Sequence, residues 1–342
     1  MHEYWDKQPV PREGTEPGEI DGSRDITKKT TKLPDGLMWS SCSMKEACEF
    51  LREYYVVHGQ FKLAYTVEGL KWSIDDSIAI RKIDTKEIIG YIASTPLDVN
   101  VEGKELKMTQ IDYLCVHPSY RSLKLAPLLI TEIKRRANKR GIWQAIYTAV
   151  TKIPTPITKS CYWHRFLDVK HLVKTGFHQT NRLREKFYEI RGPCKHAWRR
   201  MTVEDIPKVT SILKDHVKDA KIAPVVTEEY VKRVVLPIHS YVNDTNDDFI
   251  SFYDIPYERR DGSGTVNQVY RFFMVGDVYN DAFLIARNLG FHVFNSAEVG
   301  LNIETLEKEK FIKGSGSVYY YMWNWHLSEP LEEPEKLKLI IP

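Results

Sequence analysis

The chain lacks the long apolar runs, paired cysteines and leader-like start that mark several protein classes. No apolar run approaches the roughly 18 residues of a membrane span, and the first residues, with His2, Glu3 and Asp6, do not resemble a signal peptide. The five cysteines are odd in number and contain no Cys-x-x-Cys pair: Cys42, Cys48, Cys115, Cys161 and Cys194. This pattern argues against a zinc site and a disulfide framework. We therefore expect a metal-free, cytoplasmic protein.

The chain also has no large excess of charge of one sign. The 49 basic and 46 acidic residues leave a net charge of +3, which argues against a dedicated nucleic-acid binder. The densest basic run covers residues 134–136 with Lys139 and Arg140. A solvated helix face is the first interpretation of this run, and attraction of an anionic cofactor is the second. With 342 residues, 42% hydrophobic and 28% charged, the chain predicts a globular protein of two domains or a doubled fold.

The rest of the chain is organised around residues 108–136, which begin as a β-strand. Ile111, Tyr113 and Cys115 are expected on one face of this strand, and Leu114 and Val116 on the other. Because both faces are apolar, we expect a central strand of a sheet.

A basic turn follows this strand and leads into a helix. Pro127 suits the first turn of that helix, and Gly141 ends it. A strand, a turn and a helix N-terminus form an anion site, because free backbone N–H groups and the helix dipole point out of the turn. Neither a P-loop nor Gly-x-Gly-x-x-Gly is present. The spacing from Arg121 to Ala126 instead resembles the pyrophosphate loop of GNAT-type acyl-CoA transferases; the alternative is an ordinary connection with surface charges.

Hydrophobic periodicity elsewhere predicts helices interleaved with strands. Tyr4, Trp5 and residues 8–11 suggest that an extended arm lies back on the fold. The second half repeats the order of the first, so we predict an α/β protein with two similar, GNAT-like halves around one continuous mixed sheet with flanking helices. The predicted divisions are an arm (1–37), an N-terminal half (38–192) and a C-terminal half (193–342). Predicted elements are helices at 45–57, 202–217, 281–289 and 304–310, a hairpin around 84–86, and strands at 144–149, 177–188, 249–253, 269–275, 291–294 and 317–325.

Seven segments, taken in order, resemble eukaryotic N-myristoyltransferase. The segments are residues 4–11, 111–117, 121–127, 141–148, 162–165, 251–253 and 319–325. The resemblance implies a duplicated GNAT fold in which the N-terminal half holds myristoyl-CoA and both halves contact the peptide. It also implies transfer of myristate to the N-terminal glycine of nascent or cytosolic proteins by a metal-free, monomeric acyltransferase.

The resemblance further implies a role for individual residues. Backbone N–H groups of Tyr113 and Leu114, at a bulge in the strand, would form the oxyanion hole. Thr148 and the C-terminal carboxylate of Pro342 would attend the attacking amine, with the carboxylate as base. Acyl-CoA would be bound by Glu3, Tyr4, Trp5, Tyr113, Leu114, Cys115, Val116, Arg121, Ser122, Lys124, Leu125 and Ala126. The peptide would be bound by Tyr65, Thr148, Tyr162, His164, Phe177, Ser251, Tyr270 and Gly314.

The sequence departs from the family pattern at several of these places. Asp112 stands where the family has Asn, Leu123 replaces a basic residue, and Val150 and Ile312 replace glycines. The acidic loop of the family is reduced to residues 57–60, which carry no carboxylate. These changes bear on peptide preference and leave the reaction class unaffected.

The chemistry leaves three alternatives open. The turn alone is compatible with a GNAT-type N-acetyltransferase, and a non-catalytic module that binds acyl chains or peptides would need the same surfaces. Cys115 and His117 share a strand face, which would suit a nucleophile and its base, although no third group to orient them is visible. A terminal carboxylate is about four pKa units more acidic than an α-amine, and burial beside Ile340 and Ile341 would narrow that gap.

Overall fold

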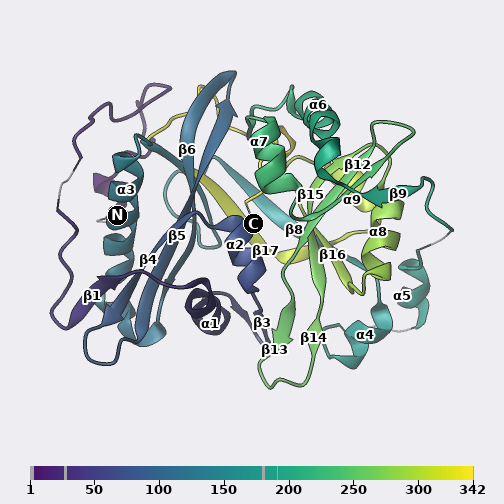
Figure 1. Cartoon of the computed structure of the whole chain (residues 1–342), viewed down its shortest axis with the longest axis horizontal. Helices are drawn as coiled ribbons and strands as arrows, with labels where there is room; N and C mark the ends of the chain where they lie inside the picture. The colour runs from purple at the N-terminus through teal and green to yellow at the C-terminus, as the bar shows by residue number, and fades with distance from the viewer. Residues whose placement is uncertain (1–3, 27–28, 179–181, 191, 342) are drawn as a thin grey trace.

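One mixed sheet runs through both halves of the protein (Figure 1). The computed structural model describes the chain except for residues 1–3, 27–28, 179–181, 191 and 342. Within the described residues the sheet has 13 strands, in the order β1-β4-β5-β6-β7-β17-β8-β16-β15-β12-β11-β9, with β10 paired to β5. A smaller sheet has the order β14-β13-β3-β2. The predicted α/β class with one continuous mixed sheet is therefore confirmed.

The strands are β1 (Leu37–Ser40), β2 (Val57–His58), β3 (Phe61–Leu63), β4 (Asp76–Lys82), β5 (Ile88–Val101), β6 (Lys104–Val116), β7 (Gln144–Ala149), β8 (Thr158–Phe166), β9 (Trp198–Arg200), β10 (Ile222–Pro224), β11 (His239–Asn243), β12 (Phe249–Asp254), β13 (Tyr257–Arg259), β14 (Thr265–Val266), β15 (Gln268–Val275), β16 (Val293–Ala297) and β17 (Ile312–Trp323). The helices are α1 (Met44–Tyr54), α2 (Val67–Ser73), α3 (Leu125–Lys139), α4 (Val169–Lys174), α5 (Arg182–Phe187), α6 (Ile206–Val217), α7 (Glu228–Tyr230), α8 (Tyr279–Asn288) and α9 (Ile303–Lys308). Short turns of other helix types are η1 (Trp5–Lys7), η2 (Pro118–Leu123), η3 (Val203–Asp205), η4 (Val231–Val235) and η5 (Pro334–Lys336).

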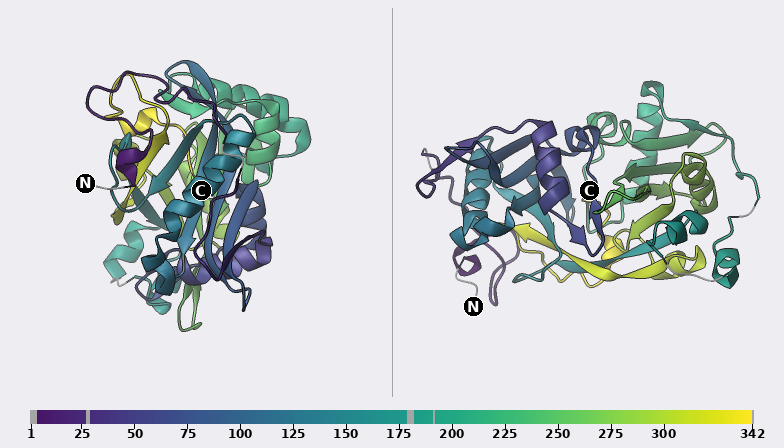
Figure 2. Two further views of the ribbon diagram at one scale, coloured as in Figure 1. Left: turned by 90° about the vertical axis from the view of Figure 1, so that its left-hand side faces the viewer. Right: turned by 90° about the horizontal axis from the view of Figure 1, so that it is seen from below.

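The two halves follow the same plan and interlock. In the first half β4, β5 and β6 are antiparallel and β6 pairs parallel with β7; in the second half β11, β12 and β15 are antiparallel and β15 pairs parallel with β16. Helix α3 connects β6 to β7, and α8 connects β15 to β16. Strand β17 pairs with β7, whereas β8 pairs with β16, so each half supplies a strand to the other. Figure 2 shows β17, in yellow, running between the halves.

Local signals predicted most of these elements. The helix expected over 202–217 forms as η3 and α6, and the Thr202 and Asp205 side chains make the reciprocal bonds of a capping box. The strand expected over 144–149 is β7. The late strand is longer than expected, because β17 begins at Ile312 and carries the glycines of residues 314 and 316 within it.

The strand expected over residues 177–188 is wrong. Helix α4 ends at Lys174, and α5 occupies Arg182–Phe187. Most residues of α5 are Arg, Leu, Glu and Lys, whose straight side chains lose little freedom in a helix, whereas aromatic residues lie only toward the ends of the stretch.

The N-terminal arm lies back on the fold, as expected. Trp5 stacks on Tyr147 of β7 with ring centroids 6.2 Å apart, Val10 is buried, and the N–H of Asn324 donates to the carbonyl of Pro9.

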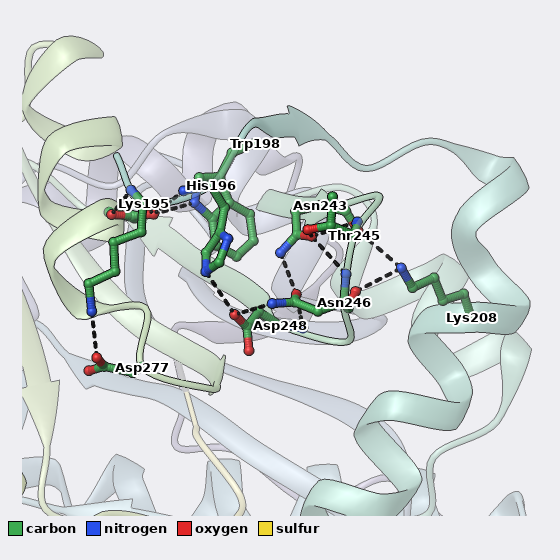
Figure 3. Close-up of polar contacts among 10 residues, drawn as sticks. Lys195, His196, Trp198, Lys208, Asn243, Thr245, Asn246, Asp248 and Asp277 are labelled. Atoms are coloured by element: carbon green, nitrogen blue, oxygen red, sulfur yellow. Dashed lines mark hydrogen bonds and ion pairs between the residues drawn. The ribbon is translucent and has the colours of Figure 1, made fainter. Parts of the chain in front are cut away.

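The start of the second half is fastened by a separate polar cluster (Figure 3). The Asp281 carboxylate of α8 accepts hydrogen bonds from the backbone N–H groups of Lys195 and His196 and from the indole of Trp198. The His196 ring lies 3.3 Å from the Asp248 carboxylate, and Lys208 of α6 donates to backbone carbonyls of the same loop. These contacts fix β9 at the edge of the sheet.

Candidate functional site

The centre of the sheet opens where β6 and β7 part. The two parallel strands pair only from Met108 with Gln144 to Ile111 with Tyr147. Beyond Tyr147, β7 continues to pair with β17, while β6 bends away. A cavity of about 660 Å³ passes through this opening, a size typical of small-ligand sites.

A β-bulge at Tyr113 bends β6. Tyr91 faces Cys115 and Ala93 faces Asp112, so Ile92 alone stands opposite both Tyr113 and Leu114. Tyr113 has a φ of +56°, a left-handed conformation that costs about 1–2 kcal/mol for a residue with a side chain. The Tyr113 hydroxyl, 2.9 Å from the Ser73 hydroxyl, holds it there. The extra residue takes the bulge out of the regular ladder, and the Tyr113 backbone lies in hydrogen-bond contact with the Tyr55 hydroxyl.

The bulge also corrects the predicted faces of β6. Tyr113 and Cys115 pack with α1 and α2, whereas Ile111 packs with Leu114 and Val116 on the α3 side. Placing Ile111 beside Tyr113 and Cys115 was wrong, because one extra residue reverses the alternation of the strand.

The N-terminus of α3 lies at one end of the cavity. Lys124, at the N-cap, has a φ of +51° and turns the chain into the helix. Leu125 and Ala126 begin the helix and line the cavity, so their backbone N–H groups and the helix dipole present positive charge to it. Arg121 and Lys124 line the same region and are exposed.

The cavity brings together most of the residues predicted for acyl-CoA. The predicted acyl-CoA residues that line it are Trp5, Tyr113, Leu114, Cys115, Val116, Arg121, Lys124, Leu125 and Ala126. Thr148, which was predicted to contact the amine and the peptide, lines it as well. Tyr4 instead lines a smaller neighbouring cavity of about 290 Å³, and Ser122 is exposed in η2 outside the cavity lining. Glu3 lies outside the described residues. Sequence reasoning missed Tyr55 and Trp143, which no local pattern distinguishes from core aromatics.

Cys115 and His117 do not form a nucleophile and base. Burial raises the pKa of the Cys115 thiol to about 12, so the thiolate is scarce at neutral pH. Nδ1 of His117 accepts the backbone N–H of Ser119, and its ring packs on Tyr54 at 4.4 Å.

A cluster of buried and half-buried tyrosines adjoins the cavity between the two halves. It contains Tyr65, Tyr162 and Tyr270, which were predicted, and Tyr55, Tyr113, Tyr253 and Tyr320. Burial raises the pKa of every one of these phenols, so all stay neutral and can donate or accept hydrogen bonds. Tyr253 and Tyr320 lie within segments that carry the resemblance, but nothing in the sequence marked their role.

His164 is held by a hydrogen-bond chain across three strands. Its Nδ1 lies 2.7 Å from Oδ1 of Asn295, whose Nδ2 donates to Oε1 of Gln268, whose Nε2 donates to the Tyr270 hydroxyl. Because Asn295 Oδ1 is an acceptor, Nδ1 of His164 carries the proton. Burial lowers the His164 pKa, so the ring is neutral at pH 7.

Gly314 lies directly against this histidine. A Cβ at Gly314 would stand 2.6 Å from Nε2 of His164 and 2.8 Å from the carbonyl oxygen of Tyr162. It sits at a register shift between β17 and β8 rather than in a hairpin turn. Only glycine therefore lets the two strands approach so closely here.

Two predicted peptide contacts lie apart from this group. Ser251 is fully buried, and its hydroxyl accepts the N–H of Phe273 at a bulge between β12 and β15. Phe177 packs on Phe61 and Tyr257 at the end of the small sheet, with ring centroids 5.3 and 6.0 Å away.

The C-terminal segment enters the core on the face that carries Tyr320. Leu339 and Ile341 are 3% and 4% exposed and belong to the cluster that contains Met108 and Ile146. The backbone of Ile341 hydrogen-bonds the Tyr320 hydroxyl. Pro342, the predicted base, lies outside the described residues.

The basic run of α3 is largely neutralised within the fold. Arg135 and Arg136 pair with the buried Glu132, and Arg136 and Arg140 also pair with acidic residues at the start of β4. Lys134 lines the cavity and lies 5.2 Å over the Trp323 ring. In the described part of the chain, no group of three or more metal-ligating side chains could hold an ion, and no helix has the length and apolarity to cross a bilayer.

Comparisons with known proteins agree with this geometry. The chain matches the family described as myristoyl-CoA:protein N-myristoyltransferase, its N-terminal domain over residues 19–161 and its C-terminal domain over residues 173–338. It is 32% identical to glycylpeptide N-tetradecanoyltransferase 2 of Danio rerio, over 99% of this chain and 77% of that protein. It is also 32% identical to the glycylpeptide N-tetradecanoyltransferase of Dictyostelium discoideum, over 99% and 92% respectively. A structure of Saccharomyces cerevisiae N-myristoyltransferase with bound myristoyl-CoA matches with a TM-score of 0.89 and 26% identity, over 97% of this chain and 90% of that chain. This chain therefore belongs to the myristoyl-CoA:protein N-myristoyltransferase family.

Proposed function

We propose that the protein transfers myristate from myristoyl-CoA to the N-terminal glycine amine of protein substrates by direct attack. The observation that carries the proposal is the cavity between β6 and β7, which joins an apolar interior to the α3 N-terminus and the Tyr113 bulge. The yeast enzyme of the same fold was solved with myristoyl-CoA. About a dozen methylenes at ~0.8 kcal/mol each give roughly 10 kcal/mol on burial, enough to anchor the acyl chain.

In this proposal the α3 N-terminus and Arg121, Ser122 and Lys124 bind the phosphates of CoA. The amides of Tyr113 and Leu114 stabilise negative charge on the thioester oxygen, which two such donors could do by about 3 kcal/mol each. The positive φ of Tyr113 supports this role, because it takes the bulge out of the ladder.

The peptide would enter along the tyrosine cluster, with His164 and Gly314 near its N-terminus. Thr148 and the terminal carboxylate of Pro342 would attend the amine. The burial of Ile341 beside Tyr320 supports the second assignment, because Tyr320 is the cross-strand partner of Thr148.

We propose further that residues 1–37 form an arm over the CoA, that residues 38–192 and 193–342 are the two halves, and that the enzyme is a cytoplasmic monomer without nucleic-acid partners. The free state of all five cysteines supports a reducing compartment.

An acyl-CoA series from acetyl to palmitoyl, assayed by thiol release with a Gly-initiated peptide, tests the function. We expect the highest kcat/KM with myristoyl-CoA and no transfer to an Ala-initiated control peptide. A preference for acetyl-CoA would assign an N-acetyltransferase, and binding without thiol release would assign a non-catalytic module.

A further inference from the structure

Asp112 lies at the point where β6 and β7 part. Ile111 and Tyr147 form the last pair between the two strands. Asp112 and Thr148 each follow this pair by one residue, so they lie at corresponding positions where the strands separate. Both line the cavity. Thr148 pairs with Tyr320 on β17, so the three residues form one row across three adjacent strands. Side chains in such a row share a face of the sheet, and here it is the face that carries Ile341.

The Asp112 carboxyl is anchored by one oxygen only. Oδ2 accepts a hydrogen bond of 2.5 Å from Nε2 of Gln110, a side chain that is itself 8% exposed. Oδ1 has neither a hydrogen bond nor an ion pair with any residue that the structure describes. The carboxyl is thus fixed in direction, with one oxygen left for a ligand in the cavity.

In the part of the chain that the structure describes, the ionisable groups whose pKa responds to the Asp112 charge are phenols. Tyr55, Tyr113 and Tyr320 each respond to its charge, and burial raises the pKa of all three, so they remain neutral. Arg271 acts on Tyr320 from β15 and forms no ion pair with Asp112. Burial raises the pKa of Asp112 to about 7, against the smaller opposing effect of the Gln110 hydrogen bond.

We propose that Asp112 is a catalytic base of this enzyme, whose free carboxylate oxygen takes a proton from the glycine ammonium before that nitrogen attacks the thioester. The inference rests on the proposed function and adds a residue to it. The ammonium gives one proton to the carboxylate, which becomes a carboxylic acid, and the amine lone pair forms the C–N bond. The C–S bond then breaks, and the leaving CoA thiolate takes a second proton from the new amide nitrogen. Asp112 returns its proton to water.

The match of acidities favours this role. An α-amine has a pKa near 8, so proton transfer to a carboxylate with a pKa near 7 is unfavourable by about one pKa unit. For an ordinary terminal carboxylate the difference is about four pKa units. The Asn that the family resemblance places here cannot accept a proton at neutral pH. A neutral Asp112 could instead donate a hydrogen bond to the oxyanion, as a carboxylic acid does in other apolar sites. That role requires the opposite pH dependence of kcat, with a fall above pH 7.

The test compares wild type, D112N and the control D98N, which changes an exposed aspartate on the neighbouring strand β5. Thiol release with myristoyl-CoA and a Gly-initiated peptide is measured from pH 5.5 to 9. We expect wild-type kcat to fall below about pH 7, and D112N to lose at least about tenfold at pH 7 with an acidic limb moved toward 8. KM for myristoyl-CoA should change less than twofold, and D98N should match wild type.

Urea unfolding of the same proteins gives a readout independent of turnover. A carboxyl whose pKa rises on folding destabilises the folded state increasingly as pH rises from about 4 to 7. The urea midpoint of D112N should therefore increase relative to that of wild type across this range. Failure of wild type to transfer myristate would refute the proposed function, while unfolding would still test the carboxyl. The inference is overturned if D112N keeps the wild-type pH–rate profile, or if wild-type kcat falls above pH 7 while D112N keeps its rate. It is also overturned if the urea midpoints of wild type and D112N change with pH by the same amount.

Discussion

Replacing Gly314 with alanine should impair peptide use while leaving acyl-CoA binding intact. The added Cβ would stand 2.6 Å from Nε2 of His164 and 2.8 Å from the carbonyl oxygen of Tyr162. Neither neighbour can retreat easily, because the Tyr162 carbonyl belongs to the backbone of β8 and His164 is tied to Asn295 at 2.7 Å. Gly314 does not have a positive φ, so the effect of alanine is steric rather than conformational.

The magnitude follows from the cost of overpacking, about 1–3 kcal/mol. If that strain falls on the peptide site, G314A should lower kcat/KM for a Gly-initiated peptide by roughly 5- to 150-fold, since 1.4 kcal/mol is a factor of ten. Titration with myristoyl-CoA in the absence of peptide should give a Kd within about twofold of wild type.

The matched control is G316A, two residues along the same strand, where an added Cβ meets nothing within 4 Å. This variant should behave as wild type in both assays. Equal kcat/KM values for the two alanine variants would refute the reasoning, as would a loss of acyl-CoA affinity in G314A that equals its loss of peptide use.

Three further outcomes are expected. C115S should keep kcat within about threefold and show no acyl-enzyme in rapid-quench experiments, because burial holds the Cys115 pKa near 12; loss of turnover with a trapped thioester in wild type would contradict this. N295A should raise the peptide KM by freeing His164, with an unchanged KM for acyl-CoA, and an unchanged peptide KM would refute the positioning role. The Arg199 pair lowers the Asp205 pKa to about 2, so its stabilisation, about 2 kcal/mol at most, is present above pH 4 and lost toward pH 2. In urea unfolding the free energy of unfolding should therefore decrease less for D205A than for wild type between pH 6 and 2.5. Equal decreases would contradict a stabilising role of the Arg199–Asp205 pair.

The amino-acid sequence by itself determined the elements with strong local patterns. The apolar residues on both faces of the strand at 108–116 predicted a central strand, and β6 is internal to the sheet. The Pro127 and Gly141 signals bracket α3, and the Thr202–Asp205 spacing predicted the capped start of the helix in the second half. These succeed because backbone propensity, capping and side-chain periodicity act within a few residues of each other.

Hydrophobic periodicity failed to predict the structure in two places, one with an extra residue in a strand and one where helix-forming residues lie between aromatic ones. The extra residue at Tyr113 moved Ile111 to the other face of β6, since a strand alternates with a period of two. Helix α5 replaced an expected strand because the aromatic residues near its ends carry less weight than the helix formers between them.

Tertiary structure alone decided which residues form the site. The exchange of β8 and β17 between the halves, the His164–Asn295–Gln268–Tyr270 chain and the row of Asp112, Thr148 and Tyr320 join segments more than a hundred residues apart. Such contacts depend on strand register across the sheet, and no local pattern of residues encodes the partner strand. The pKa of Asp112 is likewise a property of the fold, because it is set by burial in a cavity that exists only once β6 and β7 have parted.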